Sequence, residues 1–103
     1  MNSVKVPCVS AGELLTYLDE WYYQQGKGTI TYDDGSKLRF TADGQYIQAD
    51  DDTILVAMEY VDGIEIIGDF VAIVTEVGMS RRAFLIDPAS IQAMEWDNEH
   101  WNE

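Results

Sequence analysis

The hydrophobic residues of the chain recur first with the period of a helix and later with the period of a strand. Over 11–25, at about 100° per residue, they form one broad stripe with polar side chains mostly opposite, which predicts an amphipathic helix. Ser10 and Glu13 have the S-x-x-E spacing of a capping box, and Gly26 is a plausible stop. Tyr23 falls off the stripe and should be exposed. The stripe consists of Ala11, Leu14, Leu15, Leu18, Trp21 and Tyr22.

Residues 29–49 alternate apolar and polar side chains in short runs separated by turn residues, which predicts a meander of three antiparallel strands. Ile30 and Leu38 can share one face of a hairpin only if the loop between them has an odd number of residues. This constraint predicts a three-residue turn over 33–35, with Gly35 in the left-handed conformation.

The second Asp-Gly pair, Asp43-Gly44, predicts a two-residue turn that sets Phe40 opposite Ile47. Segments 53–61 and 70–77 are largely apolar on both faces. They therefore predict central strands covered on both sides by the helix, by barrel closure or by another subunit.

Asp62-Gly63 and Gly68-Asp69 are expected to bracket a short strand over 64–67. Near the end of the chain, Asp87 and Pro88 should open a brief helical turn. A last strand follows, and it should carry Trp96 into the core.

These elements predict an α+β, mainly β fold: one N-terminal helix packed on a small, strongly bent antiparallel sheet or SH3-like barrel of about six to eight short strands. The barrel is an analogy at the level of fold. A chain of 103 residues fits one domain, 1–103, made of a helix (11–25), antiparallel strands (29–96) and an acidic tail (97–103).

Acidic residues outnumber basic ones 19 to 6, for a formal net charge of -13. Direct binding to nucleic acid is not expected, because such binding relies on Lys and Arg to neutralise phosphates, and Arg81-Arg82 is the only adjacent basic pair. The chain has neither a signal-peptide pattern nor an apolar run of about 18 residues, so we expect a cytoplasmic protein that does not contact the membrane.

Catalysis is not expected either. His100 and Cys8 are the only residues of their types, and a dyad would require both ends of the chain to meet. The paired carboxylates fall in predicted exposed turns, where little would raise a pKa as general acid chemistry requires. No cofactor motif or metal centre is predicted, and the run 50–52 leaves open only weak calcium or magnesium binding.

Carboxylates instead concentrate at the predicted turns and in the tail, where the rims of a compact barrel can hold them about 6–7 Å apart, comparable to phosphates. In composition the chain resembles the short acidic proteins that phages use against restriction or CRISPR nucleases, some of which mimic DNA. We therefore expect an inhibitor that blocks the basic surface of a nuclease or other nucleic-acid-binding protein. The expected partner-binding residues are Asp33, Asp34, Asp50, Asp51, Asp52, Asp62, Asp69, Asp97 and Glu99, with Trp101 and Tyr23 as aromatic anchors.

Three other functions fit the sequence. An immunity protein or antitoxin against a nuclease toxin would use the same electrostatics. A homodimer or larger homo-oligomeric barrel would explain strands that are apolar on both faces. A small-ligand protein or enzyme would need a deep pocket lined by carboxylates with raised pKa values. Trp101 could also fold back and pack on the barrel.

Overall fold

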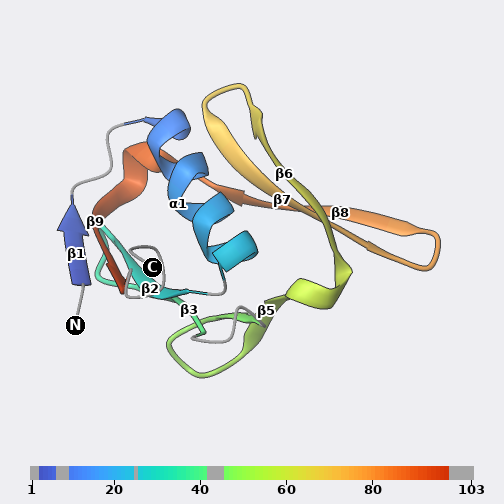
Figure 1. Cartoon of the computed structure of the whole chain (residues 1–103), viewed down its shortest axis with the longest axis horizontal. Helices are drawn as coiled ribbons and strands as arrows, with labels where there is room; N and C mark the ends of the chain where they lie inside the picture. The colour runs from blue at the N-terminus through green and yellow to red at the C-terminus, as the bar shows by residue number, and fades with distance from the viewer. Residues whose placement is uncertain (1–2, 7–9, 25, 42–45, 98–103) are drawn as a thin grey trace.

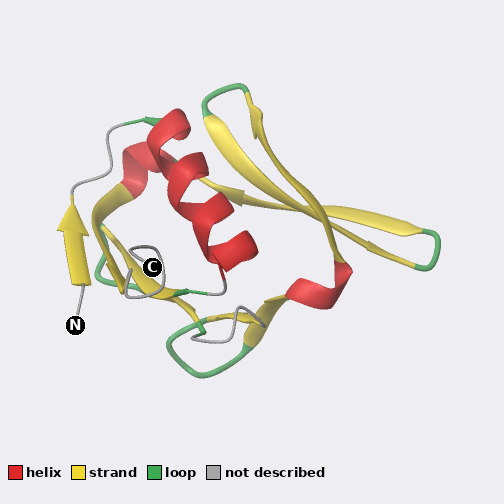
Figure 2. Ribbon diagram, in the orientation of Figure 1, coloured by secondary structure: helices red, strands yellow, loops and turns green. Residues whose placement is uncertain are grey.

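The protein, described by a computed structural model, is defined over residues 3–6, 10–24, 26–41 and 46–97. Within this part of the chain, nine strands, one α-helix and two short 3-10 helices follow one another (Figures 1 and 2). The strands are β1 (Ser3–Val6), β2 (Lys27–Tyr32), β3 (Lys37–Phe40), β4 (Tyr46–Gln48), β5 (Ile54–Ala57), β6 (Val61–Ile67), β7 (Phe70–Val77), β8 (Ser80–Ile86) and β9 (Ile91–Asp97); the helices are α1 (Ala11–Gln24), η1 (Met58–Tyr60) and η2 (Pro88–Ser90).

The strands divide into two antiparallel sheets. The larger sheet has the order β1-β9-β2-β3-β4-β5 and the smaller sheet the order β6-β7-β8. The chain passes between the sheets through η1 and returns through η2. Helix α1 packs against both sheets (Figure 1): Trp21 contacts Phe40 of β3 edge-on, and the Tyr22 hydroxyl donates to the Val61 carbonyl of β6 at 3.5 Å.

The predicted fold class, α+β and mainly β with one helix packed on antiparallel strands, is confirmed. The described residues hold nine strands rather than six to eight, because β1 precedes the helix and adds to the edge of the larger sheet beside β9. The helix spans 11–24, β2 begins at Lys27 and β9 reaches Asp97. The predicted tail beyond Asp97 lies outside the described residues.

Helix α1 begins and packs as the sequence predicts. The Ser10 Oγ accepts a hydrogen bond from the Glu13 amide at 3.1 Å, which satisfies one of the free donors of the first turn. The middle of the stripe, Leu14, Leu18 and Trp21, is fully buried. Tyr23 is 76% exposed, as expected.

The first hairpin also has the predicted geometry. Ile30 lies opposite Leu38, and the Tyr32 amide donates to the Ser36 carbonyl at 2.8 Å, so three residues form the turn. Gly35 has a φ of 88°, the left-handed conformation that favours glycine.

In the next hairpin Phe40 pairs with Ile47, also as predicted. The expected turn at Asp43-Gly44 falls within 42–45, outside the described residues.

The prediction of one central strand over 53–61 is wrong. The segment divides into β5, η1 and the start of β6, because β5 is the last strand of the larger sheet and the chain must turn there to begin the smaller one. As an edge strand, β5 leaves Ile54 and Leu55 exposed. Asp62-Gly63 is likewise not a turn, since it lies within β6 at an irregularity of the register.

Segment 70–77, by contrast, is a central strand, and its residues 71–74 are all buried. The helical turn at 88–90 and the strand after it are also as predicted. The Asp87 carboxylate caps this turn by accepting from the Ala89 amide at 3.0 Å.

The core is centred on Trp96. Its indole stacks parallel to the Tyr17 ring of α1 with the centroids 5.7 Å apart, and it lies 5.0 Å from the Phe40 ring. Gly28, its cross-strand partner on β2, leaves space for the ring, because a Cβ there would lie 2.2 Å from Trp96 Cε3. The fully buried large side chains are Leu14, Leu18, Trp21, Ile30, Phe40, Ile47, Val71, Ile73, Ile86, Met94 and Trp96.

Replacing Gly28 with alanine should therefore destabilise the fold. The added methyl group must displace the Trp96 ring or the β9 backbone, and overpacking of this kind costs about 1–3 kcal/mol. Chemical denaturation should show this loss in the free energy of unfolding.

Gly12→Ala is the matched control. A Cβ at Gly12 meets nothing closer than 3.9 Å, and alanine is the better helix former, so this variant should be as stable as the natural chain or more so. Equal stability of Gly28→Ala and the natural chain would contradict the role assigned to Gly28.

Candidate functional site

Two turns at one end of the larger sheet lie side by side and together carry five aspartates. The β2–β3 turn holds Asp33 and Asp34, and the β4–β5 turn holds residues 50–52. The Lys37 amide, just after the first turn, donates to Asp50 Oδ2 at 3.2 Å and so joins the two turns. We call this cluster the acidic end; its members, all exposed, are Asp33, Asp34, Asp50, Asp51 and Asp52.

Several of these carboxylates also hold the turns in shape. Asp34 Oδ1 accepts from the Ser36 amide at 2.9 Å and from its hydroxyl at 2.6 Å. Asp51 Oδ1 accepts from the Thr53 amide at 3.1 Å. Hydrogen bonds from these hydroxyl and amide groups lower the pKa values of Asp34 and Asp51, so both remain ionised well into the acidic range.

Few basic residues balance the acidic end. Between residues 33 and 57 the sequence has six aspartates and only two basic residues, Lys37 and Arg39. The Arg39 guanidinium pairs with Asp52 and donates to the Ala49 carbonyl at 3.1 Å. The acidic end therefore keeps a net negative charge.

Asp87, which the sequence analysis treated only as a helix opener, belongs to the same region. The Asp33 amide donates to the Ser90 carbonyl at 2.9 Å, so η2 lies against the first turn. Burial, followed by the charges of Asp87 and Asp34, raises the pKa of Tyr32 to about 12. The sequence alone does not show that Asp87 lies near the turn at 33–36, because 50 residues separate the two.

The run 50–52 does not converge on a common point. Its three carboxylates are directed to Lys37, Thr53 and Arg39, respectively. Among the described residues, no group of three or more His, Cys, Asp or Glu side chains is arranged to hold a metal ion.

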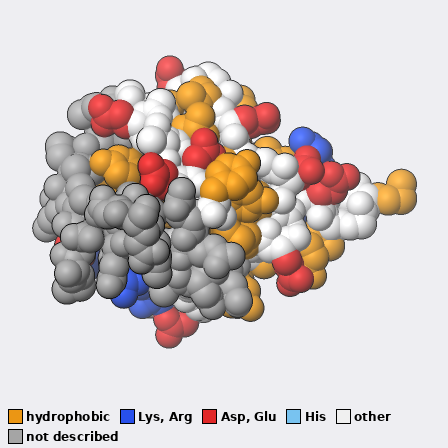
Figure 3. All heavy atoms as spheres, in the orientation of Figure 1, with side chains coloured by type: hydrophobic (Ala, Val, Ile, Leu, Met, Phe, Trp, Pro, Cys, Tyr) orange, Lys and Arg blue, Asp and Glu red, His pale blue; other side chains and the backbone are white. Residues whose placement is uncertain are grey.

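Two other predicted site residues, Asp62 and Asp69, do not join this cluster. Asp62 lies on the smaller sheet, where it pairs with Arg81 at 3.0 Å, and Glu76 approaches the same guanidinium at 3.4 Å. Asp69 is exposed in the β6–β7 turn. Figure 3 shows further carboxylates spread over the visible face, so the acidic end is a local concentration within a broadly acidic surface.

Four further predicted site residues lie in the C-terminal region and on the helix. Asp97 is the last residue of β9, and its backbone pairs with Lys27. The Asp97 side chain, Glu99 and Trp101 lie outside the described residues. Tyr23 is exposed on α1 beside Tyr22, whose ring centroid is 4.9 Å away.

Part of the outer face of the smaller sheet carries exposed apolar side chains. Strand alternation directs Val71 and Ile73 of β7 into the core, so Phe70 and its cross-strand neighbour Ile67 lie on the opposite face with Leu85. These three side chains are 39–51% exposed. Exposed apolar surface of this kind is typical of contact surfaces.

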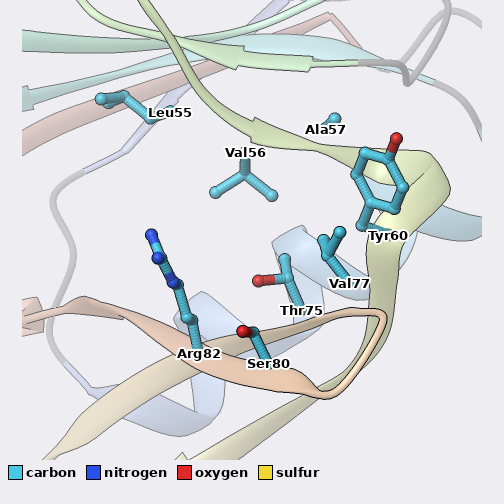
Figure 4. Close-up of a pocket in the computed structure, with 8 residues that line it drawn as sticks. All are labelled: Leu55, Val56, Ala57, Tyr60, Thr75, Val77, Ser80 and Arg82. Carbon is cyan, nitrogen blue, oxygen red and sulfur yellow. The ribbon is translucent and has the colours of Figure 1, made fainter.

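A cleft of about 400 Å³ separates β5 from the projecting β7–β8 hairpin (Figure 4). The Arg82 side chain extends from β8 toward Leu55 and Val56, and the hydroxyls of Thr75 and Ser80 turn toward the same side. Among the described residues, no carboxylate lines the cleft. Its lining residues are Leu55, Val56, Ala57, Tyr60, Thr75, Val77, Ser80 and Arg82.

The chain matches no protein-family model, no curated protein and no solved structure. No helix within the described residues is long and apolar enough to cross a membrane.

The raised pKa of Tyr32 predicts a specific alkaline behaviour. Its folded pKa of about 12 lies above the ordinary value of 10.0, so the free energy of unfolding should fall as the pH rises from 10 toward 12. Tyr32→Phe should remove this contribution to the slope. Denaturation across the alkaline range, with tyrosinate absorbance, measures both effects; ionisation of all six tyrosines together near pH 10 would be the contrary result.

The turn hydrogen bonds predict that asparagine and alanine act differently at Asp34 and Asp51. Asparagine keeps an acceptor oxygen for the amides of Ser36 and Thr53, whereas alanine does not, so alanine should lower the melting temperature more. Because the folded pKa values are lowered, the stabilisation of the natural chain over the alanine variants should be lost as the pH falls below about 3.8. Equal melting temperatures for alanine and asparagine at pH 7 would show that these bonds do not support the turns.

Proposed function

We propose that the protein is an acidic inhibitor that binds a nuclease or another basic nucleic-acid-binding protein and occupies its phosphate-binding surface. The observation that carries this proposal is the joining of two aspartate-rich turns by the Lys37–Asp50 hydrogen bond. A surface of this charge attracts a basic channel and accelerates association with it. A phage protein that opposes CRISPR or restriction nucleases by mimicking DNA is the specific setting we favour.

Carboxylates of the acidic end have oxygens that can accept hydrogen bonds from a partner. Asp34 and Asp51 each use Oδ1 within their turns and Asp50 uses Oδ2. The other oxygen of each carboxylate accepts none of these hydrogen bonds. Such oxygens can accept from the lysine and arginine side chains that otherwise bind phosphate.

The same turn hydrogen bonds prepare the acidic end for binding. They fix the carboxylate positions before the partner arrives, which lowers the entropic cost of association. By lowering the pKa values of Asp34 and Asp51, they also keep both groups charged at a lower pH than an ordinary aspartate would be. The aspartates thus serve the fold and the proposed contact together.

Two alternatives differ in what they predict. An immunity protein or antitoxin would use the acidic end in the same way, and the identity of the bound nuclease distinguishes it from a phage inhibitor. A homo-oligomer is favoured by a different observation, the outer face with Ile67, Phe70 and Leu85 exposed. Light scattering at micromolar concentration tests the homo-oligomer directly.

Neutralising the acidic end should slow partner binding without unfolding the protein. In the triple variant Asp34→Asn, Asp50→Asn and Asp51→Asn, every turn acceptor is kept and three charges are removed. Because electrostatic steering changes association rates by about 10–10³-fold, we expect a loss on the order of tenfold at low salt. Surface plasmon resonance with the captured partner measures the rate.

The matched control removes three charges elsewhere: Glu13→Gln, Glu65→Gln and Glu95→Gln, all at exposed positions. This variant should bind nearly as fast as the natural chain. If both triple variants slow association equally, net charge rather than the acidic end controls binding.

The partner itself can be found with the protein immobilised as bait in a lysate, followed by elution at rising salt. A basic protein that elutes with salt and is released by competing duplex DNA is the expected result. A partner that DNA does not displace would contradict the proposed competition for a phosphate-binding surface.

A further inference from the structure

We propose that the cleft between β5 and the β7–β8 hairpin binds a small monocarboxylate with an apolar chain. This inference is independent of the acidic end, because it concerns a different surface and the opposite charge. It rests on three observations: the position of Arg82, the polar groups beside it and the apolar wall facing it.

The two adjacent arginines of β8 are separated by strand alternation. Arg81 lies opposite Glu76 on the outer face and pairs with Asp62 as well. Arg82 lies opposite Thr75 and faces the cleft. Within the described part of the chain, the Arg82 guanidinium has no ion pair or hydrogen bond, although acidic residues outnumber basic ones 19 to 6.

Three polar side chains of the cleft lie on one wall. Thr75, Ser80 and Arg82 all belong to the inner face of the hairpin, and their polar atoms turn to the same side in Figure 4. A guanidinium offers paired donors that match the two oxygens of a carboxylate. The neighbouring hydroxyls can donate to the same oxygens.

Apart from the Tyr60 hydroxyl, the other side chains that line the cleft are apolar. Leu55 and Val56 face Arg82, and Val77 and the Tyr60 ring line the remainder. The volume of about 400 Å³ falls at the small end of the range of about 300–1,000 Å³ typical of small-molecule sites. A single anionic head with a short hydrocarbon or aromatic chain matches this combination of walls.

The charge of the protein also limits the ligand. A chain with a net charge of -13 repels phosphates and other multiply charged anions, and one guanidinium balances only one negative charge. A monocarboxylate is therefore favoured over a phosphate ester or a dicarboxylate.

The test is a titration with sodium hexanoate, followed by amide chemical shifts of the ¹⁵N-labelled full chain. We expect shifts at 55–57 and 75–82. Arg82→Gln should weaken binding about tenfold or more, because it removes a charge-assisted hydrogen bond. Arg81→Gln removes the same charge from the adjacent position on the outer face, so it should change the affinity by less than about twofold.

Three further arms vary the ligand and the cleft. Acetate, which lacks the chain, and hexanol, which lacks the carboxylate, should both bind more weakly than hexanoate. Val77→Asp, which places a carboxylate at an exposed position of the cleft, should abolish hexanoate binding while the remaining amide shifts stay native.

Several results would overturn the assignment. An equal loss in Arg81→Gln and Arg82→Gln would show a response to net charge alone. Equal binding of acetate, hexanol and hexanoate would exclude a site that binds both the carboxylate and the apolar chain. Tighter binding of a short peptide with a free C-terminal leucine would assign the cleft to a protein partner, and no shifts at millimolar hexanoate would exclude the site.

Discussion

The fold depends on the close packing of the Trp96 indole against Gly28, under the ring of Tyr17. This contact fixes β9 beside β2 in the middle of the larger sheet and seats α1 on it. The indole N–H groups of Trp96 and Trp21 are both buried without a hydrogen-bond partner among the described residues. An unsatisfied buried donor costs about 1–3 kcal/mol, so aromatic packing must outweigh that cost at the centre of the core.

The acidic end is attached to the same framework. The hairpin that carries Gly28 near the start of β2 ends in the turn with Asp34, and the register of β2 with β3 sets where this turn stands. Its aspartates are held by hydrogen bonds to neighbouring amides rather than left mobile in solvent. A large negative charge opposes compaction, yet here part of that charge forms the turns. The same aspartate side chains therefore stabilise the turns and form the proposed contact surface.

Local signals predicted the local structure well. Ser10 with Glu13 located the start of the helix, and the parity of Ile30 and Leu38 gave the three-residue turn at Gly35. The segment at 53–61 was misread because its two-sided apolar pattern arises from an edge strand and a 3-10 turn between sheets, not from one covered strand. A pattern along the chain cannot show where one sheet ends.

The candidate sites could be predicted from the sequence less well than the local structure, because they depend on tertiary contacts. The sequence indicated aspartates at 33–34 and 50–52, but the hydrogen bond from Lys37 that joins them crosses 13 residues. Asp87 lies near the first of these turns only because η2 packs against it. The opposite directions of Arg81 and Arg82, and the cleft that receives one of them, depend on the pairing of β8 with β7.

Hydrogen–deuterium exchange of the protein bound to its captured partner locates the contact without altering a residue. If the acidic end is the contact, new protection is expected at amides 33–37 and 50–53, with the amides of the outer face around Ile67 and Leu85 unchanged. Protection confined to that outer face, with the two aspartate turns exchanging as in the free protein, would contradict a contact at the acidic end.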